Sequence, residues 1–313
     1  MPSEPKPGER GEGFPKQKQI LSERIFLGAD GRVRPIFRAL VFALALIAVN
    51  YEIARAVGSI TQDSPLWTQF FWGSLALVFG FLLLSWIFLR LADGTGFSGL
   101  GLTLRRGWGR ELAIGFGVGM ALQIFVLGIF LATRTVHYAK GGGYDLQFWH
   151  RVLANVALFV IAATVEELTF RGYGFQKLIE SLGAPAALLL TSLIFGVLHL
   201  GNPHATFFST VNTFLAGIIL GIPYIRTRSM WMQIGLHWAW NLTMATLVSL
   251  PVSGIDFGPH FFSTQSSGPG WLTGGIYGPE GGAVVTIVSL AGIVWLLGAR
   301  QLSSSPARQL DLQ

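Results

Sequence analysis

No cysteine occurs in the sequence, which excludes disulfide bonds, thiolate metal ligands and a cysteine nucleophile. Charge is also scarce, because Asp, Glu, Lys and Arg make up only 12% of the residues whereas hydrophobic residues make up 51%. A soluble fold needs apolar stripes that charged residues interrupt every turn or two, and that pattern is missing. The first 35 residues contain no apolar core with a small-residue cleavage site, so we expect no secretory signal there. These absences indicate a membrane protein.

Long charge-free runs predict helices that cross the membrane, since a crossing takes about 20 apolar residues. The longest run, 181–225, exceeds one crossing, and Gly201-Asn202-Pro203 divides it into two helices. We therefore predict an all-α fold, a polytopic transmembrane helical bundle of about eight helices. The expected helices are 36–57, 66–89, 112–132, 148–180, 184–200, 205–225, 230–250 and 282–297.

Three parts of the chain differ in composition. Residues 1–35 are rich in Pro, Gly and charge, and we expect a disordered cytoplasmic tail. Residues 36–300 form the expected transmembrane helical domain, and 301–313 form a cytoplasmic C-terminal tail. Within the domain, 251–281 is rich in Gly, Pro, Ser and aromatic residues, which predicts an interfacial loop.

The basic residues predict the orientation of the bundle through the positive-inside rule. With eight crossings and a cytoplasmic N-terminus, only Arg55, Arg134, Lys140 and Arg151 of the 22 Lys and Arg residues lie outside. We therefore expect both termini in the cytoplasm and a multi-pass protein of the cell membrane, the inner or plasma membrane. The net charge of +6 lies in loops between apolar segments, so we expect the lipid bilayer and no nucleic acid as its partner.

Ionisable side chains at membrane depth indicate a functional site, because burying them is costly. Glu167 and Arg171 are one helical turn apart and can form an ion pair, which could equally be purely structural. Glu166 lies about 100° around the same helix and is free to act as a general base. On another helix, His237 and Asn241 place two hydrogen-bond donors on one face.

His199 stands alone in an apolar helix, one turn after Phe195, whose ring can exclude water beside the imidazole. A lone histidine in such a helix is more often a satisfied packing group, and Asn241 could join helices as ordinary interhelical glue. Together, however, a base, a second polar group and two donors suffice to add water to a carbonyl and hold the oxyanion.

These residues resemble the motifs EExxxR, FxxxH and HxxxN/B of the CPBP (ABI) family, which includes CAAX prenyl endopeptidases and bacteriocin-processing or immunity proteins. The resemblance covers about 148–250, and the loop containing Trp271 and Glu280 is similar to one found in many bacterial members. It implies an intramembrane endopeptidase that cleaves a membrane-associated peptide or protein. It also implies the following roles: Glu166 and His199 activate water, His237 and Asn241 stabilise the oxyanion, and Glu167, Arg171 and Phe195 organise the site.

Metal use stays open in this reading. Glu166, His199 and His237 could together hold a catalytic zinc ion, but no HExxH segment is present. We favour the reading without a cofactor and assign no metal ligand.

Two other functions remain as alternatives: a polar-lined membrane transporter, and a non-catalytic immunity or assembly protein with the same fold. A transporter should show inverted repeats, and none is visible. The sequence leaves the oligomeric state and the substrate undetermined. It also poses a problem of depth, because Glu166, His199 and His237 meet only if the helix of His199 tilts or starts late, or if the helix of Glu166 extends well past Arg171.

Overall fold

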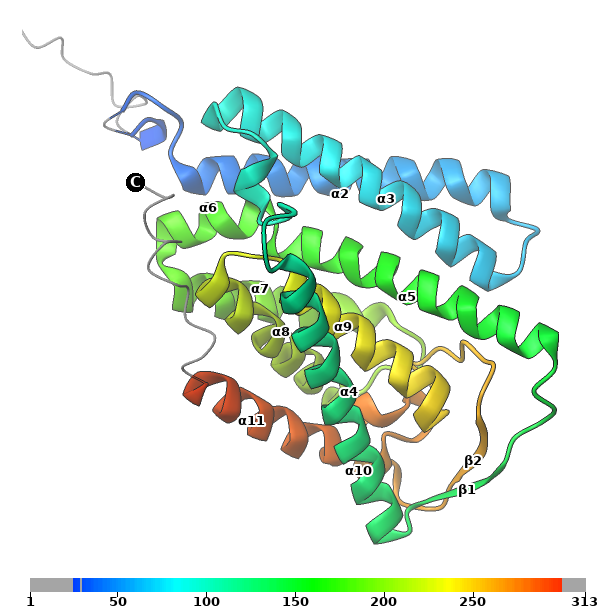
Figure 1. The fold of residues 1–313 in the computed structure, drawn as a ribbon. Helices are drawn as coiled ribbons and strands as arrows, with labels where there is room; N and C mark the ends of the chain where they lie inside the picture. The colour runs from blue at the N-terminus through cyan, green and yellow to red at the C-terminus, as the bar shows by residue number, and fades with distance from the viewer. Residues whose placement is uncertain (1–24, 29, 300–313) are drawn as a thin grey trace, which may run out of the picture.

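The computed structural model describes residues 25–28 and 30–299, and over this range it is the predicted all-α helical bundle (Figure 1). The expected tails at 1–24 and 300–313 lie outside the described residues. Residues 25–28 and 30–34, which the sequence assigns to the first tail, contact the bundle. Leu27 forms an isolated antiparallel bridge with Val33, and the ring of Phe26 lies 4.7 Å from that of Phe37.

Six helices are long and apolar enough to cross a membrane, and two shorter helices, of which the last is apolar, lie where the sequence predicts the seventh and eighth. When the π-helical and 3₁₀ ends are included, all begin and end within about one helical turn of their predicted bounds. The six long spans are α2 (Pro35–Thr61), α3 with its π-helical end η1 (Leu66–Asp93), α4 (Trp108–Thr133), α5 with α6 (Leu146–Leu182), α7 with η3 (Ala184–Gly201) and α8 (Phe207–Thr227). The shorter ones are α9 (Trp231–Thr243), which η4 (Met244–Val248) prolongs, and α11 (Ala283–Gly298).

The helix that carries Glu166 does extend past Arg171. α5 (Leu146–Arg171) ends there, Gly172 leaves helical geometry with ψ −147°, and α6 (Tyr173–Leu182) resumes immediately. Because α6 adds nearly three turns before the chain reverses at Gly183, Glu166 lies far from that reversal. α7 (Ala184–Leu198) then returns from it and places His199 at its far end. This arrangement removes the problem of depth.

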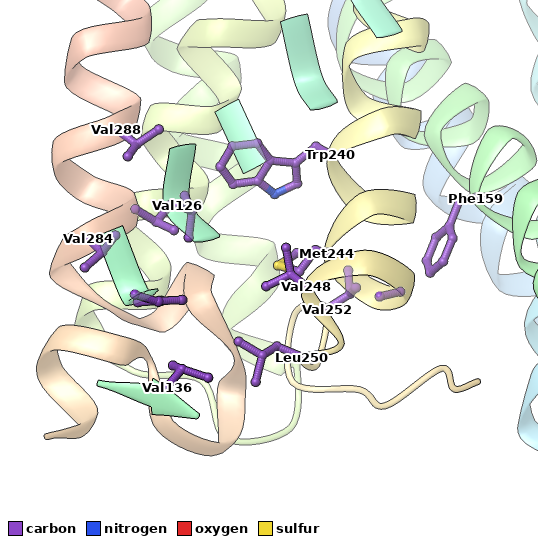
Figure 2. Packing of buried hydrophobic residues seen from close by; sticks show 13 residues of the cluster. Val126, Val136, Phe159, Trp240, Met244, Val248, Leu250, Val252, Val284 and Val288 are labelled. Atoms are coloured by element: carbon purple, nitrogen blue, oxygen red, sulfur yellow. The ribbon is translucent and has the colours of Figure 1, made fainter. Parts of the chain in front are cut away.

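Close packing of α4 against α9 fixes the helix that carries His237 and Asn241. A Cβ atom added at Gly115 would lie 1.9 Å from the carbonyl oxygen of Met232, and one at Gly235 would lie 2.2 Å from that of Leu112. The two backbones therefore touch, which only glycine permits. Beside this contact, Val126, Trp240, Met244 and Val288 pack between α4, α9 and α11 (Figure 2).

The segment 251–281 has regular structure that the sequence did not predict. β2 (Phe262–Ser266) pairs antiparallel with β1 (Val136–Lys140), which lies between α4 and α5. After β2 come α10 (Gly270–Thr273) and the short 3₁₀ helices η5 (Gly275–Tyr277) and η6 (Pro279–Gly281). The ladder thus joins two links between helices at one end of the bundle (Figure 1).

Candidate active site

A buried ion pair stands at the end of α5, as the spacing predicts. The Nη1 atom of Arg171 lies 3.2 Å from Oε1 of Glu167, and the exposed fractions of the two side chains are 2% and 0%. Nη2 of Arg171 donates to the carbonyl oxygen of Gly217 on α8 at 2.7 Å, and the guanidinium lies 5.4 Å from the ring centre of Phe195. The pair therefore joins α5 to both α7 and α8.

The same carboxylate also holds His237. Nδ1 of His237 lies 2.9 Å from Oε1 of Glu167, and because a carboxylate accepts hydrogen bonds, Nδ1 carries the proton. The other ring nitrogen, Nε2, lies 3.6 Å from Oε2 of Glu166. Arg171, Glu167, His237 and Glu166 thus form a continuous chain of alternating basic and acidic groups across α5 and α9.

This chain has zero net charge when the imidazole of His237 carries both protons, since two cations then face two carboxylates. A neutral set is the arrangement that a low-dielectric interior tolerates best, because no charge is left uncompensated. The two carboxylates differ in access to solvent. Glu167 is fully buried, whereas 34% of the side chain of Glu166 is exposed, so only Glu166 is open to a water molecule.

His199 is oriented by its own helix. Its Nδ1 lies 2.7 Å from the carbonyl oxygen of Phe195, which can only accept, so Nδ1 donates and the neutral ring keeps Nε2 as an acceptor. The ring of Phe195 lies 4.4 Å from that of His199 and 6.5 Å from that of His237. The predicted contact between Phe195 and His199 is present, and Phe195 touches both imidazoles.

Asn241 lies one turn beyond His237 on α9 and is buried. Its side chain has no hydrogen bond with any other described residue, so its amide is available to a ligand. Trp240, next to it, donates from Nε1 to Oε1 of Glu280 at 2.9 Å. The same carboxylate accepts hydrogen bonds from the backbone and the hydroxyl of Ser253, both at 2.8 Å.

One cavity of about 60 Å³ is lined by all four candidate catalytic groups. Glu166 reaches it from α5, His199 from the end of α7, and His237 and Asn241 from α9. Its volume is enough for a few water molecules. The cavity adjoins a groove of about 510 Å³, because the lining of both includes Glu166, His199 and Asn241.

Two residues of the cavity wall were not assigned a role from the sequence. Asn212 of α8 donates from Nδ2 to the backbone oxygens of Glu280 and Gly282, at 2.8 and 2.9 Å, and accepts from Thr286. Glu280 therefore closes one side of the cavity while its own carboxylate holds α9. The sequence could have pointed to Asn212, because it is an amide within the charge-free run 181–225. The role of Glu280 depends on contacts with residues distant in sequence.

Among the described residues, no group of three or more His, Cys, Asp or Glu side chains is placed to hold a metal ion. Glu166, His199 and His237 share a cavity, and the hydrogen bond from Nδ1 of His237 to Glu167 leaves Nε2 as the free ring nitrogen. We derive no chemical step through a metal.

Comparisons with known proteins cover this part of the chain. Residues 148–243 match the model of a family described as "Type II CAAX prenyl endopeptidase Rce1-like". A Bacillus subtilis (strain 168) protein named "Putative membrane peptidase YdiL" is 24% identical over 246 residues, which cover 75% of this chain and 92% of that protein. No solved structure matches. The matched residues contain all four groups that meet in the cavity.

Proposed function

We propose, on the premise that this chain belongs through residues 148–243 to the CAAX-protease (CPBP) family, that it hydrolyses a peptide bond of a membrane-associated substrate with water activated by Glu166 and His199. The family match and the Bacillus subtilis protein named "Putative membrane peptidase YdiL" support a membrane-embedded peptidase in general. The roles of the individual residues below are our proposal.

Glu166 acts as the general base. No described residue donates a hydrogen bond to its carboxylate, and it borders both the cavity and the groove. In the first step, a water molecule gives one proton to Glu166 while its oxygen attacks the carbonyl carbon of the substrate. His199 accepts a hydrogen bond from the same water at Nε2 and so orients the oxygen lone pair toward that carbon.

His237 and Asn241 stabilise the oxyanion that this attack creates. The doubly protonated imidazole of His237 donates one hydrogen bond from Nδ1 to Glu167 and another from Nε2 to the oxyanion. Asn241 donates to the oxyanion from its free amide. In the second step, the carbon–nitrogen bond breaks and Glu166 passes its proton to the leaving amine. The products are a carboxylic acid and an amine, and Glu166 returns to its starting charge.

Glu167 and Arg171 are positioning residues in this scheme. Glu167 fixes which nitrogen of His237 faces the cavity. Arg171 donates to Glu167 and to the backbone oxygen of Gly217 on α8, and so links the carboxylate to α8. Phe195 separates the two imidazoles from lipid. A metal ion has no place in this scheme.

The observation that carries the proposal is the convergence of Glu166, His199, His237 and Asn241 on one cavity from three different helices. We would reconstitute the purified protein in liposomes with a library of lipid-anchored peptides and analyse the products by mass spectrometry in H₂¹⁸O. We expect cleaved peptides with one ¹⁸O atom in the new carboxylate, and none with Glu166→Gln. Equal cleavage by Glu166→Gln, or no cleavage by the folded wild type, would overturn the proposal.

A further inference from the structure

The groove beside the active site lies between the α2–α3 hairpin and α5. Its lining takes residues from 53–61 of α2, 66–77 of α3 and 159–166 of α5. The loop that contains Val252 and Phe257 forms the remaining wall. This loop is anchored, since Nδ2 of Asn155 on α5 donates to the backbone oxygens of Phe257 and Gly258 at 3.2 and 2.7 Å.

The segments of α2 and α3 lie toward one end of the bundle, and 159–166 lies in the middle of the span that α5 and α6 form, so the groove runs from that end to the active site. Residues 53–61 are the last turns of α2, and 66–77 are the first turns of α3, so the groove surrounds the turn between them. Figure 1 places this turn at the same end as β1, β2 and the start of α5. The start of α2, α6 and the end of α11 lie at the opposite end.

The basic residues identify the two ends. The basic residues in the links at the groove end or in the helical turns beside them are Arg55, Arg134, Lys140 and Arg151. The links and adjoining turns at the opposite end carry more, namely Arg32, Arg34, Arg90, Arg105, Arg106, Arg110, Arg226 and Arg228. Since Lys and Arg accumulate in cytoplasmic links, the groove end is extracytoplasmic.

The cytoplasmic end is closed by buried ion pairs. Asp93 pairs with Arg38 of α2 and, at 2.9 Å, with Nζ of Lys177 on α6, and fewer than 10% of each of these side chains is exposed. Between this cluster and the cavity lies the buried pair of Glu167 and Arg171. A substrate segment approaching from the cytoplasm would have to break both sets, whereas the groove is open.

From these observations we propose that the active site takes its substrate from the extracytoplasmic side, through the groove between α2, α3 and α5. This inference rests on the proposed function for its chemistry. The substrate is the outer juxtamembrane segment of a membrane-anchored polypeptide. Apolar groups such as Phe70 and Leu77 suit its apolar side chains, and the polar groups Gln69 and Asn202 suit the peptide groups of an extended backbone.

The absence of cysteine makes a direct test simple, because any introduced thiol is unique. Gly58 of α2 and Gly73 of α3 both line the groove, and a Cβ atom added at either meets no atom within 4 Å. We would express Gly58→Cys and Gly73→Cys separately and treat intact spheroplasts with a membrane-impermeant maleimide. Both thiols are expected to react without permeabilisation.

Three matched glycine variants with equally open surroundings calibrate the labelling. Gly143→Cys, between β1 and α5, should react from outside, and Gly109→Cys, at the start of α4, only after permeabilisation. Gly117→Cys, in the middle of α4 and exposed on the bundle surface, should not react because it faces lipid. The inference would be overturned if the groove thiols reacted only after permeabilisation, or if they did not react at all, as is expected of Gly117→Cys. An inverted pattern for Gly143→Cys and Gly109→Cys would overturn it too.

The outcome is separable from that of the proposed function. Outside labelling of the groove thiols by a protein that cleaves no peptide would leave the sidedness standing and remove the peptidase. Peptide cleavage by a protein whose groove thiols react only after permeabilisation would support the peptidase and reject the extracytoplasmic entry. If both hold, modification of Gly73→Cys with the maleimide should reduce cleavage by at least about tenfold, because the adduct occupies the substrate path.

Discussion

Glu167 is the residue on which the other groups of the site depend. It is fully buried, and its Oε1 contacts both Arg171 and His237, on two different helices. Its second oxygen, Oε2, has no hydrogen-bond partner among the described residues. A carboxylate so deeply buried is tolerable only with compensating charge, so Arg171 and His237 stabilise the fold as well as the site.

Replacing Glu166 should abolish turnover with little effect on folding. Glu166→Gln keeps the size of the side chain but cannot accept a proton from water, so kcat should fall by about 10²- to 10⁴-fold. Glu180→Gln is the matched control, because that glutamate lies on α6 at the end of the bundle opposite the groove, where it pairs with Lys177 and its side chain is 45% exposed. The rates should be compared in the liposome assay at equal amounts of folded protein. A rate for Glu166→Gln close to that of wild type would show that another group is the base.

Replacing Glu167 should lower stability as well as activity. Glu167→Gln leaves the Arg171 guanidinium uncompensated in the bundle interior, which should cost about 3–5 kcal/mol of unfolding free energy. The double variant Glu167→Gln with Arg171→Met should recover part of this loss, because no charge is then left alone. SDS titration in mixed micelles would measure both.

The control for this pair is Glu52→Gln, whose partner Arg55 is exposed at the surface, so its loss should cost less than about 1 kcal/mol. If Glu167→Gln were no more destabilising than Glu52→Gln, the charge chain would not contribute to stability as we describe.

At this scale, the sequence predicts what lies within one helix and little more. The pair Glu167–Arg171 and the contact Phe195–His199 follow from helical spacing alone. The bond from His237 to Glu167 joins residues 70 positions apart, and that from Trp240 to Glu280 spans 40, so neither follows from periodicity. The three motifs predicted that these groups meet, without indicating which atoms contact one another.

At the scale of single elements, α4 positions α9 and thus half of the site. Gly115→Ala should therefore be harmful, because its Cβ would lie 1.9 Å from the carbonyl oxygen of Met232 and force the helices apart. We expect a loss of about 1–3 kcal/mol, as for an overpacked core, and reduced activity because His237 and Asn241 move with α9. SDS titration and the cleavage assay would measure the two effects.

Gly117→Ala, on the same helix, is the matched control. Its Cβ meets no atom within 4 Å, so the substitution should be neutral or stabilising by up to about 1 kcal/mol through helix propensity. Equal effects of the two substitutions would mean that the contact between α4 and α9 does not limit stability.

The loop that forms one wall of the groove should respond to pH. Asp256 and His260 of this loop are hydrogen-bonded to each other, and this bond lowers the pKa of Asp256 and raises the pKa of His260. Nδ1 of His260 also donates to the backbone oxygen of Ala245. The ion pair is therefore complete between the two pKa values. It is lost as the pH rises through the raised value for His260 and as it falls through the lowered value for Asp256.

We expect the melting temperature to decline slightly above neutral pH, by an amount that corresponds to less than about 1 kcal/mol, since the pair is partly exposed. Asp256→Asn should remove this dependence, whereas His137→Ala, at an exposed position of β1, should retain it. A profile of Asp256→Asn that matches wild type would assign the transition to another group.

The helix bounds were predictable because charge-free runs and breaks such as Gly201-Asn202-Pro203 mark them directly. The strands were not, since β1 and β2 are short, largely exposed and bring together links about 120 residues apart. A ladder of this kind depends on how α4 and α9 are packed, which the composition of 251–281 does not encode.

At the scale of the whole molecule, the even number of crossings needs an argument beyond helix length. α11 is shorter than the six long spans, and α9 with η4 is no longer than the shortest of them, so the two could instead form a hairpin that enters and leaves on the cytoplasmic side. The charge distribution does not distinguish the two arrangements, because both leave the C-terminal end of α11 in the cytoplasm.

The β1–β2 ladder does distinguish them. β1 follows α4 and precedes α5, so it lies at the extracytoplasmic end, and β2 is hydrogen-bonded to it over the register Val136↔Ser266 to Lys140↔Phe262. We therefore expect the link between α9 and α11 to reach the same side and both helices to cross. Gly270→Cys in α10, exposed and with open space around its Cβ, should then react with impermeant maleimide in intact spheroplasts as Gly143→Cys does. Reaction only after permeabilisation would place the ladder, and with it the mouth of the groove, on the wrong side of the membrane.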